Sequence, residues 1–98
     1  MTDIINEEKY KEPDFNFFVT TLAIQASVCL GILPNPATNK KEENIQQARF
    51  IIDTLAMLKD KTKNNLSAEE GKLIENILAE LQLQYANQAN AKKQGEQK

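Results

Sequence analysis

From Phe15 to Leu33 the chain reads FNFFVTTLAIQASVCLGIL, a stretch without a charged residue in a protein whose residues are 27% charged. Written as a helix with 100° per residue, this stretch carries apolar side chains on two opposite faces. A surface helix of a small monomeric protein needs only one apolar face, which packs on the core. The second face therefore predicts a further contact, made with a second copy, a different protein or lipid.

The two faces have different predicted roles. The inner face, expected to pack on the core, comprises Phe15, Phe18, Val19, Leu22, Ala26, Cys29 and Leu30. The outer face comprises Phe17, Thr21, Ile24 and Val28, spaced by four, three and four residues as in a coiled-coil seam. We expect these four residues to form the interface of a homo-oligomer, with a dimer as the favoured state.

Local signals predict where this helix begins and ends. The carboxylate of Asp14 can accept hydrogen bonds from free N–H groups of the first turn. Gly31 suits the left-handed conformation that ends many helices, and the two prolines that follow it prevent continuation. We predict a helix over residues 15–30 and a connector over residues 31–43, in which Asn39 can take a positive φ.

Two further helices are predicted to form a hairpin. Capping-box patterns place their starts at Asn44 with Gln47 and at Ser67 with Glu70. The first should reach about Lys63, and its inward stripe is Ile45, Ala48, Ile51, Ile52, Leu55, Ala56 and Leu58. The inward stripe of the second is Leu73, Ile74, Ile77, Leu78, Leu81 and Tyr85. The predicted fold is an all-α three-helix bundle, a long helix followed by a helical hairpin, completed by oligomerisation because a core this small is thin.

This pattern divides the chain into three parts. Residues 1–13 are polar and mixed in charge, and we expect a flexible N-terminal tail. Residues 14–87 form the helical domain. Residues 88–98 lack apolar anchors, and we expect the last helix to fray there into a disordered polar C-terminal tail.

Composition argues against catalysis, cofactor binding and metal binding. The sequence has no His and a single Cys, so the usual proton shuttle, the commonest metal ligand and an internal disulfide are all missing. Cys29 lies on an apolar helix, where burial would raise its pKa and keep it inert. We therefore expect a non-enzymatic protein with no catalytic, cofactor-binding or metal-binding residues. One cysteine also suits a reducing compartment, which predicts a cytoplasmic location.

Three kinds of partner remain to be weighed. A net charge of −2 provides no basic surplus for phosphates, so we expect no nucleic-acid partner. Polar residues dilute the uncharged stretch, and the other two helices need it to cover their stripes, so we do not expect it to span a membrane. A peripheral membrane protein anchored by this helix is one alternative to self-association. The other is an adaptor that binds a different protein through this helix or through a possible patch of Phe50, Asp53 and Met57.

Several short motifs resemble those of a small bacterial family catalogued as domain of unknown function 1844. The resemblance lies in GILPNP at residues 31–36, in IDTLAML at 52–58 and, most specifically, in KTKNNL at 61–66, followed by Glu69 and Glu70. Glycine is usual in the family at the positions of Asn39 and Asn64. Asparagine is the next best residue for a positive φ, so these departures preserve the turns. The resemblance implies a short bacterial helical protein and brings no activity, cofactor or catalytic residue.

Overall fold

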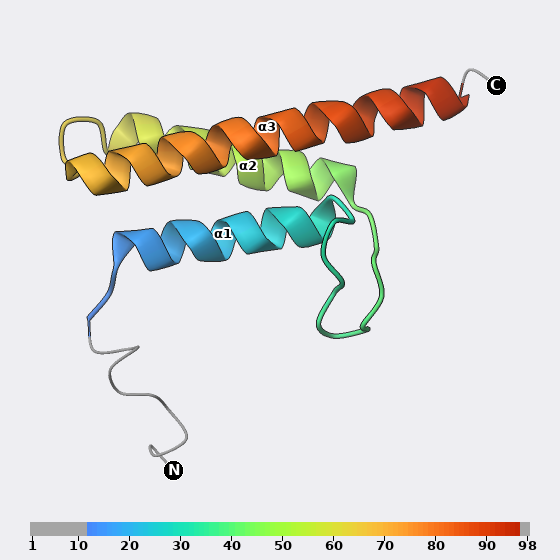
Figure 1. Cartoon of the computed structure of the whole chain (residues 1–98), viewed down its shortest axis with the longest axis horizontal. Coiled ribbons are helices and arrows are strands. Elements are labelled where there is room, and N and C mark those ends of the chain that lie inside the picture. The colour runs from blue at the N-terminus through green and yellow to red at the C-terminus, as the bar shows by residue number, and fades with distance from the viewer. Residues whose placement is uncertain (1–11, 97–98) are drawn as a thin grey trace, which may run out of the picture.

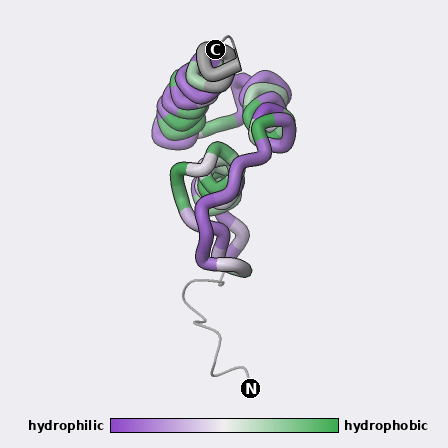
Figure 2. The backbone as a smooth tube through the Cα atoms, turned by 90° about the vertical axis from the view of Figure 1, so that its right-hand side faces the viewer, coloured by the Kyte–Doolittle hydropathy of each residue, from purple (hydrophilic) through white to green (hydrophobic). Residues whose placement is uncertain are grey.

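The computed structural model of the chain describes residues 12–96. Its helices are α1 (Phe15–Cys29), α2 (Ile45–Lys61) and α3 (Ala68–Glu96), and every pair of them is in contact. α1 and α2 run antiparallel, as do α2 and α3 (Figure 1). Seen from the side, the three helices occupy the corners of a triangle (Figure 2). The predicted all-α bundle of one helix followed by a helical hairpin is confirmed.

The core lies along the axis of this triangle and is built from the predicted stripes. The buried apolar residues are Val19, Ala26, Leu30, Ala48, Ile51, Ile52, Leu55, Ile74, Leu78 and Leu81. Partly buried side chains, among them Phe15, Leu22 and Tyr85, pack around this cluster. Every helix contributes its inward stripe, which is why no two helices could bury the core without the third.

Capping hydrogen bonds fix the starts of α2 and α3. The backbone N–H of Gln47 donates to Oδ1 of Asn44 at 3.1 Å, and Nδ2 of Asn44 donates to Oε1 of Gln47 at 3.2 Å. At α3 the reciprocal pair is complete, since the N–H of Glu70 donates to Oγ of Ser67 and the N–H of Ser67 donates to Oε1 of Glu70. The predicted capping box at α3 is confirmed. At α2 the side-chain cap from Asn44 is present, but the backbone N–H of Asn44 donates to the oxygen of Cys29 instead of to Gln47, so the box is only half formed.

Within residues 12–96, three residues adopt a positive φ, all at turns where the sequence suggests one. Gly31 ends α1 at 79°, Asn39 lies in the connector at 59°, and Asn64 lies in the α2–α3 turn at 72°. The Asn side chain tolerates this region better than other non-glycine residues, because its short amide can hydrogen-bond locally. Asparagine at 39 and 64 therefore supplies the left-handed conformation that these two turns need.

Two details of α1 differ from the sequence-based expectation. Asp14 occupies the N-cap position, but its side chain makes no capping hydrogen bond. Phe18, assigned to the inner face, is 50% exposed. Its position lies at the edge of the arc centred on Val19 and Ala26, where α2 and α3 no longer cover it, while Ala23 packs on the opposite edge.

The third helix extends beyond its predicted end near Asn87. α3 continues to Glu96, so the helix includes residues 88–96, which the sequence assigned to the C-terminal tail. Nε2 of Gln88 donates a hydrogen bond to the backbone oxygen of Leu30, so the extension binds the end of α1. The alanines at 86, 89 and 91 also favour helix without needing a core. Of the predicted N-terminal tail, residues 1–11 lie outside the described residues.

Candidate functional site

The candidate site is the outer face of α1, the side of this helix that points away from α2 and α3. Ile24 is 51% and Phe17 is 47% exposed, whereas Thr21 and Val28 are half-buried. The hydroxyl of Thr21 donates to the backbone oxygen of Phe17 at 2.8 Å. This internal hydrogen bond satisfies the only side-chain hydroxyl among the four, so the face as a whole is apolar.

The connector, residues 30–44, is held in place at its base and at its tip. At the base the N–H of Asn44 donates to the oxygen of Cys29 at 2.7 Å, and Leu30 and Glu43 form an isolated β-bridge. At the tip the N–H of Asn35 donates to the oxygen of Lys40 at 2.8 Å. Because both ends are fixed by backbone hydrogen bonds, the connector forms a defined wall rather than a loose strand of chain.

Side chains reinforce the tip of the connector. Asn35 accepts from the N–H of Ala37 at 2.8 Å, as in an Asx-turn. The carboxylate of Glu42 accepts from the hydroxyl of Thr38 at 3.1 Å and from the amide of Asn35 at 3.4 Å. Lys40 and Lys41, which follow in the chain, are both exposed to solvent.

A groove lies where the connector meets the outer face of α1, and we call it the end groove. Its volume is about 560 Å³. It is lined by Ile24, Val28 and Cys29 of α1, by the connector residues 33–36 and by Gln47 at the start of α2. Leu33 is 40% exposed, so the apolar surface continues from α1 onto the connector. The sequence analysis did not assign Leu33 and Pro34 to this surface. Their position about one turn after the end of α1 is the feature of the sequence that could have placed them beside its outer face.

Cys29 lines the end groove as a half-buried thiol. Burial raises the pKa of Cys29 above its ordinary value, as the sequence predicted. The thiol therefore remains protonated near neutral pH, and its reactivity depends on whether the groove is open to solvent.

The second predicted patch lies on the back of α2, away from the core. Phe50 is 72% exposed, and Met57 is also exposed. Asp53, between them, forms a surface ion pair with Arg49 across 3.7 Å. Such a pair contributes little to stability. Met57 also borders a wider groove of about 1300 Å³ between the end of α2 and the start of α3.

The described part of the chain lacks the features of two other kinds of site. Between residues 12 and 96 no three His, Cys, Asp or Glu residues gather in a way that could hold a metal ion. Over the same part of the chain, none of the helices has both the length and the hydropathy needed to cross a bilayer.

Comparison with known proteins gives one result. The family model for a domain of unknown function, number 1844, matches residues 12–87, which include all of α1 and α2 and most of α3. No curated protein and no solved structure matches the chain.

Proposed function

The chain belongs to the family of domain of unknown function 1844, and we propose that it is a non-enzymatic interaction module that self-associates through the outer face of α1. The observation that carries the proposal is the position of Ile24. This residue is 51% exposed in the middle of an uncharged face, on the side of α1 that the bundle does not cover. An exposed apolar face of this kind, adjoining a groove, is typical of a protein interaction site.

The chemistry of the face favours a second copy as the occupant. No charged side chain lies between Phe15 and Leu33, so two copies of the face can meet without opposing like charges. A two-fold dimer brings the same surface of both subunits together, which requires a self-complementary surface. The four–three–four spacing of the outer face meets this requirement, because it allows knobs-into-holes packing of two helices.

The non-enzymatic part of the proposal rests on the residue types available. The chain has no His, its single thiol is protonated near neutral pH, and Glu70 of the acidic pair in the first turn of α3 is a capping residue. General acid–base or nucleophilic catalysis needs a base beside an activated group. The chain offers no such pair on the outer face of α1.

An adaptor function is the second candidate, favoured by the exposure of Phe50. A different protein would then bind the patch of Phe50, Asp53 and Met57 on the back of α2. The patch lies on another helix from the outer face of α1, so the two kinds of contact could be made at the same time. Recovery of the same partner by wild type and by a Phe50→Ser, Met57→Ser variant would argue against this use of the patch.

Sedimentation of the purified chain over a concentration series tests self-association. We expect the weight-average mass to rise from one protomer towards two between low and high micromolar concentration. A single monomeric species at high micromolar concentration would overturn the proposal. Flotation with liposomes in the absence of detergent tests the membrane-anchor alternative, and partition into the lipid fraction would support that alternative instead.

A further inference from the structure

The positions of the end groove and of Phe17 on the same helical face carry a more specific inference, which rests on the self-association proposed above. We propose that two α1 helices pack antiparallel, so that Phe17 of the second copy enters the end groove of the first. Each groove is then completed by a residue of the other copy. The two copies exchange the contact reciprocally, as a two-fold axis demands.

The spacing along α1 fits this arrangement. Phe17 lies near the start of the outer face, and the end groove lies between Ile24 and Val28 near its end. At 1.5 Å per residue the groove is about 13 Å along the helix from Phe17. A two-fold axis that crosses the face beside Thr21 brings each Phe17 opposite the groove of the other copy. Thr21 of one copy then lies close to Thr21 of the other.

The connector decides between antiparallel and parallel packing. In both views it projects on the side of α1 that faces away from α2 and α3 (Figures 1 and 2). In a parallel dimer the two connectors would project at the same end and obstruct each other. In an antiparallel dimer each connector lies beside the first turns of the other α1, where Phe17 is found, and Leu33 and Pro34 form the far wall of its pocket.

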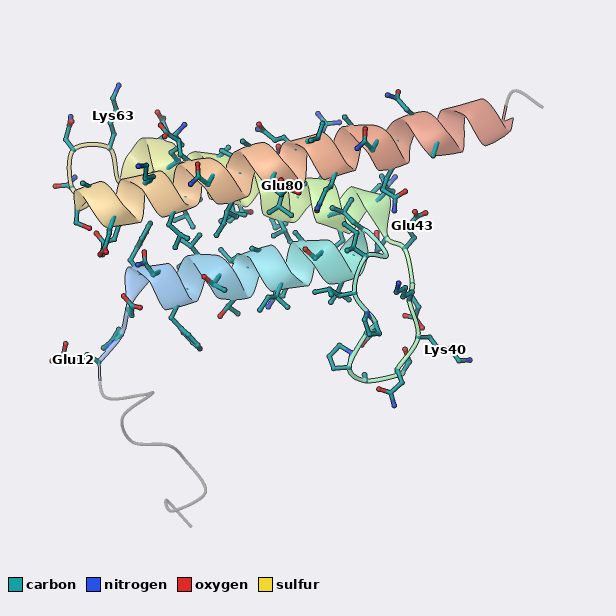
Figure 3. All side chains as sticks on the ribbon, in the orientation of Figure 1. Glu12, Lys40, Glu43, Lys63 and Glu80 are labelled. Atoms are coloured by element: carbon teal, nitrogen blue, oxygen red, sulfur yellow. The ribbon has the colours of Figure 1, made fainter. Side chains whose placement is uncertain are left out.

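Charge at the two ends of the face favours the same direction. Glu12 and Asp14 precede α1, whereas the connector carries Lys40 and Lys41 followed by Glu42 and Glu43. The carboxylate of Glu42 is turned to Thr38 and Asn35 within the connector, and Lys40 is exposed to solvent. Figure 3 shows Glu12 and Lys40 at opposite ends of α1, both on the side away from α2 and α3. Antiparallel packing brings Lys40 towards Glu12 of the second copy, at each end of the interface. Parallel packing brings Lys40 towards Lys40, which is unfavourable.

Disulfide trapping tests the direction of the packing. In a Cys29→Ser background, chains carrying Glu12→Cys are mixed with chains carrying Lys40→Cys and oxidised at a concentration where dimers form. We expect the mixed disulfide to be the main cross-linked product. Predominant joining of Lys40→Cys chains to each other would show parallel packing and overturn the inference.

A Thr21→Cys variant in the same background separates failure of this inference from failure of self-association. Position 21 lies near its counterpart in either direction, so this variant reports association alone. Thr21→Cys chains that cross-link while the mixed disulfide is missing would reject the direction and leave self-association standing. Thr21→Cys chains that neither cross-link nor sediment as dimers would reject both.

The placement of Phe17 in the groove has its own test, with its neighbour Phe18 as the matched control. Both residues are about half exposed, but Phe18 lies off the outer face. We expect Phe17→Ala to raise the dimer Kd at least tenfold and Phe18→Ala to change it less than threefold. Cys29 lines the groove, so its alkylation should slow in the wild-type dimer and recover in Phe17→Ala. Equal effects of the two substitutions on Kd, or alkylation of Cys29 that is independent of protein concentration, would place Phe17 elsewhere.

Discussion

Replacing Ile24 by Ser should weaken self-association far more than it weakens the fold. Ile24 lies at the centre of the outer face, one turn before Val28 and at the edge of the end groove. The substitution shortens the side chain and makes it polar without adding a charge. The helix keeps all its backbone hydrogen bonds, so the apolar contact is the main quantity that changes.

The size of the effect follows from the exposure of Ile24. Complete burial of an Ile side chain stabilises by about 1.5–3 kcal/mol. Since 51% of the residue is exposed within its own chain, about half of that amount is available to a second copy. A two-fold interface contains Ile24 twice, so the dimer should lose about 1.5–3 kcal/mol, or roughly 10- to 150-fold in Kd.

The fold should tolerate the same change. The half of the Ile24 side chain that packs within the chain contributes roughly 0.8–1.5 kcal/mol. Small domains have a total stability of about 5–15 kcal/mol, so the variant should remain folded. Urea unfolding followed by circular dichroism, at a concentration where the wild type is monomeric, measures this loss separately from association.

Sedimentation equilibrium of the wild type, Ile24→Ser and a Phe50→Ser control measures the association. Phe50 is more exposed than Ile24 and lies on another helix, so its substitution removes exposed apolar surface without touching the outer face of α1. We expect Phe50→Ser to change Kd less than threefold. An equal weakening by both variants would show that exposed apolar area, and not this face, drives association. An unchanged Kd in Ile24→Ser would refute the reasoning outright.

Further predictions concern the turns, the caps and the thiol. Asn64→Ala should destabilise by about 1 kcal/mol in a urea titration, because Asn64 holds a φ of 72° that Ala adopts at a cost, whereas Asn64→Gly should not. Ser67→Ala should cost about 1 kcal/mol by removing the hydroxyl that caps α3, and an unchanged midpoint would contradict this. Gln88→Ala should lower the free energy of unfolding by about 1 kcal/mol, because the backbone oxygen of Leu30 loses its side-chain donor. A loss of stability no larger than that caused by Gln→Ala at a nearby exposed position would count against this contact. At pH 8, Cys29 should react with iodoacetamide more slowly in the folded chain than in urea, because burial raises its pKa. The raised pKa also means that this thiol's contribution to stability is full below its unfolded pKa and is lost as pH rises through the higher folded pKa. If Cys29 reacted with iodoacetamide at the same rate in the folded chain and in urea, the burial of its thiol would be contradicted.

Much of the candidate site could be predicted from sequence because it lies on one helix. The four–three–four spacing of Phe17, Thr21, Ile24 and Val28 places them on one face of any regular helix, whatever surrounds it. The expected exposure of Phe17 and Ile24 is confirmed. That these residues contact a second copy stays a prediction.

The groove beside them could not be predicted in the same way. Its walls come from α1, the connector and the start of α2. Their meeting depends on the bridge between Leu30 and Glu43 and on the hydrogen bond from Asn44 to Cys29. These contacts join residues far enough apart that no local periodicity records them.

By itself, the sequence determined the three helices, the N-caps of α2 and α3, the positive-φ turns and the two-sided character of α1. These features follow from helical periodicity and from the conformational preferences of single residues, which act over one or two turns. Only the tertiary structure decided that Phe18 lies outside the covered arc, that Gln88 donates a hydrogen bond to the end of α1, and that the connector forms the wall of a groove. Each of these features depends on contacts between segments that are distant in the sequence. Those contacts are set by the packing of the whole core and not by any single stretch of chain.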